Sequence, residues 1–274
     1  MESDLLLLAG LLLAVGVIAG ILAGLLGVGG GIVIVPALYH VFAYLEIDPA
    51  IRMHLAVGTS LATIIPTSIR SVLSHHKRGA VDMDLLRSWA APLFIGVVAG
   101  TALAAYADNT GLVLVFATVA LLVATHMAFV SGDWHWREQL PQGAAGQSVP
   151  VFVGGISAMM GIGGGTLSVP ILTAFGTAIH RAVATAAGFG LVIAVPATIG
   201  FVIAGLGADS LPAYSLGYVS LVGFAVIVPG TVLAVPLGVK IAHWLNPKPL
   251  RLAFAMFLAI TAFRMYWDLW MQTG

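Results

Sequence analysis

The chain has 274 residues, of which 60% are hydrophobic and only 8% are charged, and its mean hydropathy is +1.06. A soluble domain carries roughly 25% charged residues, so this chain lacks the polar surface that water requires and is predicted to lie in a membrane. Its formal net charge of zero argues against a nucleic-acid partner. Because it has no cysteine, disulfides, iron–sulfur clusters and thiolate zinc sites are excluded.

Ten apolar segments follow one another along the chain. We expect them at 5–26, 31–44, 54–74, 85–106, 111–130, 149–162, 165–177, 182–206, 213–239 and 249–270. The segments 149–162 and 165–177 are too short to cross a hydrocarbon core of roughly 30 Å at about 1.5 Å per residue. They are expected to form a hairpin whose tip stops inside the membrane. The segment 31–44 is short as well, and its longer partner 5–26 is expected to be tilted. Whether the hairpins cross fully or turn back halfway stays open.

Two stretches 134 positions apart have nearly the same sequence, GVGGGIVIVPAL at 27–38 and GIGGGTLSVPIL at 161–172. The likeness continues outside the glycines, because VVAGTALA at 97–104 aligns with IVPGTVLA at 227–234. The chain therefore divides into a first membrane repeat (1–130), a cytoplasmic linker (131–148) and a second membrane repeat (149–274).

Each repeat is predicted to be a glycine hairpin followed by three spanning helices. Three is an odd number, so the second repeat must be inverted relative to the first, as in many transporters. The predicted fold is an all-α polytopic membrane protein of 8–10 membrane segments, built from two inverted-topology repeats that each begin with a broken helix.

The basic residues orient this fold by the positive-inside rule. When the loop at 75–84 is placed in the cytoplasm, nine of the eleven Lys and Arg residues fall on the cytoplasmic side and two, Arg52 and Arg264, on the other. Both termini are then expected to be periplasmic.

The two glycine clusters are predicted to form one anion site. Each cluster precedes a short helix, which begins at Ile32 or Thr166, and the free N–H groups and positive dipole end of such a helix favour an anion. Glycine lets a ligand approach these N–H groups closely. The other interpretation is close helix packing through glycine. The backbone candidates for substrate binding are Gly29, Gly30, Gly31, Ile32, Gly163, Gly164, Gly165 and Thr166, and the candidates for shaping or gating the helices are Gly27, Pro36, Pro66, Gly161, Pro170 and Pro196.

The pair of GxGGG…VP motifs, in two similar halves of an apolar chain of this length, resembles the sulfite exporter TauE/SafE family, also called the 4-toluene sulfonate uptake permease family. The resemblance covers nearly the whole chain. It implies a permease of the bacterial inner membrane for sulfite, sulfonates, sulfoacetate or a related organosulfur anion.

Four polar side chains complete the predicted site. Thr59 and Thr185 occupy aligned positions and could donate hydroxyl groups beside the glycines, with Ser60 next to the first of them. The alternative is that these hydroxyls bond carbonyls of their own helices. Arg70 aligns with Gly200, so it breaks the symmetry of the halves. An arginine within a membrane helix is a candidate for substrate binding, although it could also extend to the nearby cytoplasmic surface.

The predicted function is a secondary carrier that moves a small sulfur-containing anion by alternating access. A gradient of H⁺, Na⁺ or the substrate itself would drive it. An anion channel for the same substrates and a carrier for another small organic anion are the alternatives. No HExxH or GxSxG motif indicates an enzyme, and no cofactor or metal is expected. The expected partners are the substrate, the lipid bilayer, the coupling ion and a second copy of the chain.

Overall fold

The structure, a computed structural model, describes residues 2–27, 29–129, 143–242 and 247–273. These residues form ten helices and one antiparallel pair of short strands. In chain order the elements are α1 (Glu2–Leu26), α2 (Gly31–Tyr44), α3 (Pro49–His76), α4 (Met83–Tyr106), α5 (Asn109–Phe129), α6 (Gly143–Met160), α7 (Gly165–Ala174), α8 (Ile179–Gly205), β1 (Ser215–Leu216), β2 (Val219–Ser220), α9 (Leu221–Ala242) and α10 (Pro247–Thr273).

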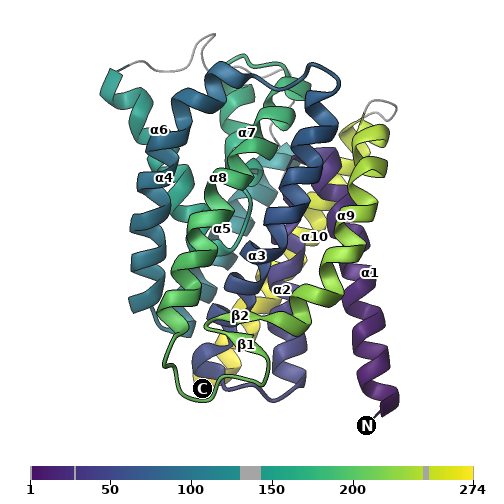
Figure 1. Ribbon diagram of the computed structural model, residues 1–274, viewed down its shortest axis with the longest axis vertical. Coiled ribbons are helices and arrows are strands. Elements are labelled where there is room, and N and C mark those ends of the chain that lie inside the picture. The colour runs from purple at the N-terminus through teal and green to yellow at the C-terminus, as the bar shows by residue number, and fades with distance from the viewer. Residues whose placement is uncertain (1, 28, 130–142, 243–246, 274) are drawn as a thin grey trace.

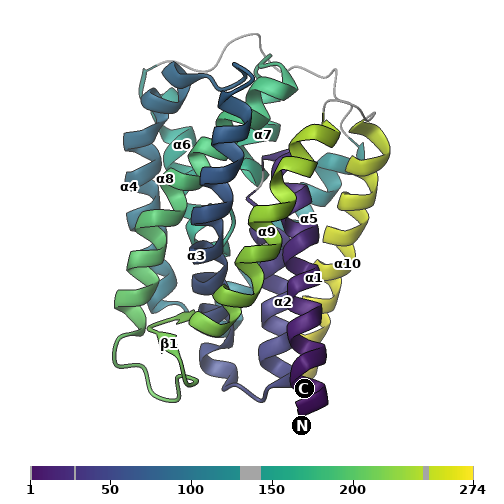
Figure 2. The same cartoon turned by 45° about the vertical axis from the view of Figure 1, so that its right-hand side comes forward.

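Six of the described helices are long and apolar enough to cross a membrane, namely α1, α3, α4, α5, α8 and α9. The chain is therefore an all-α, multi-pass membrane protein. Its helices stand side by side along the long axis of the bundle (Figures 1 and 2), and α1 begins at the same end of the bundle as α10 finishes.

The two short helices run in opposite directions from the middle of the bundle. In Figure 1, α2 descends from the centre toward the end that holds both termini, whereas α7 rises from the centre toward the other end. Thus α1 and α2 form one hairpin, α6 and α7 form another, and the two hairpins enter the bundle from opposite ends.

Helices from the two predicted halves pack in reciprocal pairs. Helix α1 packs on α9 while α6 packs on α4, and α3 packs on α8 while α5 packs on α10. Suppose that α1–α5 correspond in order to α6–α10. Swapping the halves then turns the pair α1 and α9 into the pair α6 and α4, and it leaves the pair α3 and α8 and the pair α5 and α10 unchanged. An inverted repeat requires this pattern; the inversion itself stays a prediction.

Glycines let α1 approach α9 closely, and they let α4 approach α6 closely. A Cβ added at Gly20 of α1 would overlap the carbonyl oxygen of Thr231 on α9, and one added at Gly100 of α4 would overlap the carbonyl oxygen of Gly155 on α6. Membrane helices gain packing energy from such contacts because lipid gives them little hydrophobic drive to associate.

The structure differs most from the predicted segments at two places. Helix α9 begins at Leu221 rather than near 213, because Tyr214 and Gly217 have positive φ angles, 60° and 53°, and the chain forms the hairpin of β1 and β2 instead. Helix α6 begins at Gly143, inside the range predicted for the linker, while 131–142 lies outside the described residues.

Candidate glycine-tip site

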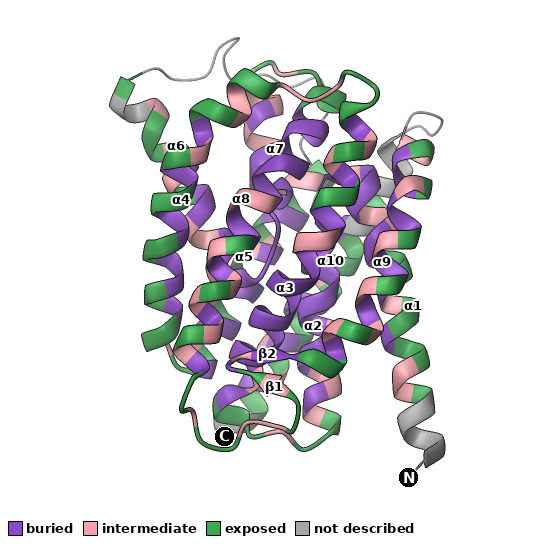
Figure 3. Cartoon of the chain, viewed as in Figure 1, coloured by how far each residue is buried: buried purple, intermediate pink, exposed green. Residues whose placement is uncertain are grey.

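The two glycine clusters meet at the centre of the bundle. We call residues 27–31 the first tip and 161–165 the second tip. The glycines of both tips are buried, and the centre of the bundle is buried throughout (Figure 3). A Cβ at Gly29 would lie 3.3 Å from the Cα atom of Gly163, and one at Gly31 would overlap the carbonyl oxygen of Gly161. The predicted meeting of the two clusters is therefore present in the structure.

Each tip also packs on a long helix of the opposite half. A Cβ at Gly27 would overlap the carbonyl oxygen of Val183 on α8, whereas a Cβ at Gly161 would lie 2.8 Å from the Cα atom of Val57 on α3. Since Val57 and Val183 are each two residues before the aligned threonines, the two contacts are equivalent. Glycine is required at both positions for close approach, and both have left-handed φ angles, 66° and 69°.

The tips differ in conformation where the short helices begin. Gly30 precedes α2 with a φ of 79°, in the left-handed region, whereas Gly164 precedes α7 with a φ of −54°, in the right-handed region. Neither residue provides a side-chain cap. The first turns of α2 and α7 thus direct their N–H groups and positive dipole ends to the buried centre. Ile32 is fully buried in the first turn of α2.

Hydroxyl groups lie directly on the second tip. The Ser60 hydroxyl on α3 donates a hydrogen bond of 2.7 Å to the carbonyl oxygen of Gly161. Thr166, in the first turn of α7, is only 3% exposed, and its hydroxyl oxygen has no hydrogen-bond partner among the described residues. Its neighbour Ser168 instead donates to the carbonyl oxygen of Gly164 at 2.6 Å. An unpaired buried hydroxyl is costly, and Thr166 therefore has an unused donor in the first turn of α7.

Thr59 and Thr185 bond to backbone groups that begin two other helices. The Thr59 hydroxyl oxygen accepts the N–H of Ser220 at 2.8 Å, just before α9. The Thr185 hydroxyl oxygen accepts the N–H of Asp82 at 3.0 Å, just before α4. The aligned threonines therefore make equivalent bonds, and in this structure those bonds anchor α9 and α4.

Arg70 lies away from the tips. It is exposed on α3, six residues beyond Ile64, whose side chain packs near Gly29 and Gly31. Six helical residues span about 9 Å, so the tips and Arg70 are separated along the helix axis. The four predicted prolines lie inside helices: Pro36 in α2, Pro66 in α3, Pro170 in α7 and Pro196 in α8.

The hairpin of β1 and β2 lies against α3, α8 and α9 toward the end of the bundle that holds the termini (Figure 1). The sequence patterns did not indicate it. The Tyr218 N–H donates to the Phe201 carbonyl oxygen at 3.2 Å, and the Tyr218 ring lies 4.9 Å from that of His54. Burial raises the pKa of the Tyr218 hydroxyl above its ordinary value, because the charged form loses solvation. Within the described part of the chain, no three His, Asp or Glu side chains converge as metal ligands would.

Comparison with known proteins assigns this architecture. Residues 12–265 match the family described as Sulfite exporter TauE/SafE. The chain belongs to this family. A probable membrane transporter protein of Haemophilus influenzae is 32% identical over 93% of this chain and 97% of its own length. Another, of Methanocaldococcus jannaschii, is 30% identical over 95% of this chain and 96% of its own length. No solved structure matches the chain.

Membership of the TauE/SafE family makes the chain a membrane transporter rather than an enzyme, since its named relatives are probable membrane transporters. The buried tips are thus the candidate site of a TauE/SafE transporter.

Proposed function

We propose that the chain is a secondary carrier for a small sulfur oxyanion or organosulfur anion, which binds between the two glycine tips. The observation that carries the proposal is that α2 and α7 both begin, without side-chain caps, at buried glycine tips that touch each other. Two positive dipole ends and the first-turn N–H groups that have no partner in their own helix suit a ligand with a concentrated negative charge and several acceptor oxygens. The unpaired Thr166 hydroxyl adds a donor to this set.

The burial of the tips supports alternating access over a channel. Gly29–Gly31 and residues 161–165 are all buried, so an anion reaches them only when packed helices move apart. A channel requires a continuous path, whereas a carrier exposes its site to one side at a time. Because each tip packs on a helix of the opposite half, a movement of one half against the other would act directly on the site.

In a bacterial inner membrane, the distribution of charge supports an orientation with both termini in the periplasm. The end of α3, the start of α8 and the end of α9 lie at the end of the bundle opposite the termini (Figure 1), and they bring Lys77 and Arg78, Arg181 and Lys240 to that end. By the positive-inside rule this end faces the cytoplasm. We expect a gradient of H⁺ or Na⁺, or of the substrate itself, to drive transport, and we expect a second copy of the chain as a partner.

A thermal-unfolding screen of the purified protein identifies the substrate. The ligands are sulfite, sulfate, thiosulfate, sulfoacetate, taurine and an aromatic sulfonate. A ligand at 100 times its Kd stabilises the folded state by about 2.7 kcal/mol, so a selective rise in Tm is expected for the true substrate. Saturable counterflow of that ligand in liposomes supports a carrier, whereas single-channel current would contradict one.

Two variants of α7 locate the site. Thr166→Val removes the unpaired hydroxyl with little change of shape, and we expect it to weaken the ligand-dependent shift while the ligand-free Tm stays the same or rises. Ser168→Ala is the matched control, because its hydroxyl is already bonded to Gly164 within the same helix. Equal ligand shifts in Thr166→Val and the unaltered protein would remove Thr166 from the site.

A further inference from the structure

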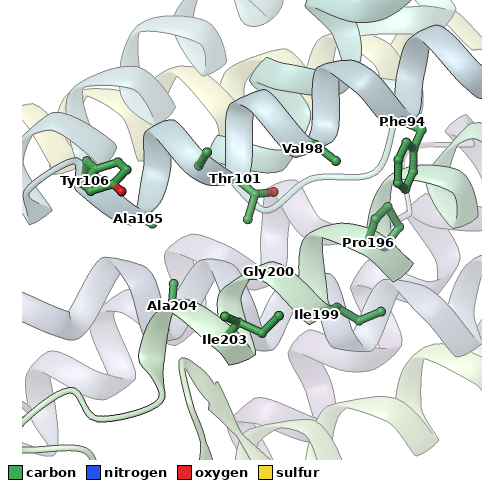
Figure 4. Close-up of a pocket in the computed structure, with 11 residues that line it drawn as sticks. Phe94, Val98, Thr101, Ala105, Tyr106, Pro196, Ile199, Gly200, Ile203 and Ala204 are labelled. Carbon is green, nitrogen blue, oxygen red and sulfur yellow. The ribbon is translucent and has the colours of Figure 1, made fainter.

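A lateral groove runs between α4 and α8. Its volume is about 520 Å³. Figure 4 shows Phe94, Val98 and Thr101 of α4 facing Pro196, Ile199 and Ile203 of α8 across it. Because both helices are membrane spans, the groove lies within the membrane-spanning part of the protein.

The groove opens sideways and is closed at its floor. On its rims Val98 is 52% exposed and Ile203 is 63% exposed. At the floor the helices touch, since a Cβ at Gly200 would overlap the γ-methyl group of Thr101. The rims therefore face the surrounding hydrocarbon, and no passage leads through the floor at this point toward the bundle interior.

The surface inside the groove is apolar. Apart from Tyr106 at one end, Thr101 is the one described lining residue with a hydroxyl group, and its hydroxyl oxygen is buried. Water would find no partners along such a surface, and an empty groove would forgo dispersion contacts with its lining. An occupant made of hydrocarbon satisfies the lining without any polar cost.

The dimensions of the groove correspond to one leaflet of the bilayer. Phe94 and Tyr106 mark its ends on α4, and twelve helical residues span about 18 Å. Half of a hydrocarbon core of roughly 30 Å is about 15 Å. Tyr106, the last residue of α4, is almost fully exposed, as expected of an aromatic side chain at the level of the headgroups.

We propose that this groove binds one acyl chain of a phospholipid from the leaflet on the side of the chain termini. A single hydrocarbon chain fits a furrow between two helices that touch at Gly200 and Thr101. A helix of a second copy, about 10–12 Å in diameter with its side chains, would rest on the rims, because it does not fit as a whole between two helices in contact. Lipid surrounds the groove at all times, so shape complementarity rather than the hydrophobic effect retains the chain.

Adjacent residues of α4 provide a matched test. Ala102 lines the groove, whereas Leu103 is exposed on α4 outside it. The probe is dioleoyl phosphatidylglycerol, titrated onto the detergent-purified full chain and its variants, with bound lipid counted by native mass spectrometry. We expect one retained lipid per chain, a Kd raised at least about tenfold by Ala102→Trp, and no change with Leu103→Trp.

Three outcomes would overturn the proposal. Equal lipid binding by Ala102→Trp and the unaltered chain would show that the groove is not the site. Equal loss in both tryptophan variants would indicate a general effect on the α4 surface. If Ala102→Trp instead converts a dimer into a monomer at unchanged lipid stoichiometry, the groove is a contact between copies. An unchanged Tm for Ala102→Trp confirms that the variant is folded. The glycine-tip proposal does not depend on any of these results.

Discussion

The Ser60 hydroxyl on α3 donates a hydrogen bond to the Gly161 carbonyl oxygen in the second tip, 101 positions away in the chain. Gly161 belongs to the opposite predicted half, so this bond joins the two halves at the centre of the protein. Ser60 aligns with Ala186 on α8, which has no hydroxyl, and the bond therefore breaks the symmetry of the halves.

Removal of this bond should destabilise the protein. Ser60→Ala leaves the buried Gly161 carbonyl without the hydroxyl that bonds it, and we expect a loss of about 1–3 kcal/mol in the free energy of unfolding. Thermal unfolding in detergent measures the effect. Thr63→Val is the control, since the Thr63 hydroxyl bonds only the Ser60 carbonyl of its own helix, and its loss should cost less. Equal Tm values for the two variants would contradict a special role for Ser60.

The two aligned threonines should differ in their effect on stability. Thr59→Val leaves the N–H of Ser220 without a partner at a buried position. Thr185→Val also removes the partner of the Asp82 N–H, but Asp82 is half-buried, so water can replace the lost hydroxyl. We expect the free energy of unfolding to fall by about 1–3 kcal/mol in Thr59→Val and by less than about 1 kcal/mol in Thr185→Val.

Hydrogen exchange locates the effect of these threonine substitutions. The amides at the start of α9 should exchange faster in Thr59→Val, while those at the start of α4 change little in Thr185→Val. The prediction is wrong if the two variants show the same increase, because the difference in burial would then have no consequence.

Much of the fold could be predicted from the sequence because apolar segments inside a bilayer form helices. The segment predicted at 31–44 is the helix Gly31–Tyr44, since the glycine cluster ends immediately before it and an apolar run follows. The duplicated motif also indicated that the two clusters meet, and they do. The hairpin at Ser215–Ser220 was missed, because its apolar residues resemble a continuation of α9 and only its backbone angles reveal the turn.

The partners of the polar side chains could not be predicted. Thr59 bonds a residue 161 positions away, and no local pattern encodes such a distance. The conformation of the tips is equally hidden, because Gly30 and Gly164 occupy the same place in the same motif but have φ angles of 79° and −54°. Tertiary packing, which differs around the two tips, selects between conformations that glycine adopts with similar ease.

Alanine at Gly30 should be more harmful than alanine at another left-handed glycine. Gly79 has a φ of 66° with nothing within 4 Å of an added Cβ, so Gly79→Ala measures the backbone cost alone, about 1–2 kcal/mol. A Cβ at Gly30 would in addition lie 2.9 Å from the carbonyl oxygen of Ala19, which cannot move without α1. We expect a larger fall in Tm for Gly30→Ala than for Gly79→Ala. Equal falls would show that the first tip has room for a side chain.

Helix α1 offers the sharpest test of the packing between the predicted halves. Gly20 and Gly10 lie on the same helix, but a Cβ at Gly20 would overlap the Thr231 carbonyl of α9, whereas Gly10 has nothing within 4 Å. Gly20→Leu should therefore force α1 away from α9 and cost about 3 kcal/mol or more, while Gly10→Leu should leave stability nearly unchanged. The measurements are Tm and the monodisperse fraction in size-exclusion chromatography. If Gly20→Leu is as stable and as monodisperse as Gly10→Leu, then α1 does not pack on α9 through this face, and the packing of α6 on α4 has no counterpart in the other predicted half.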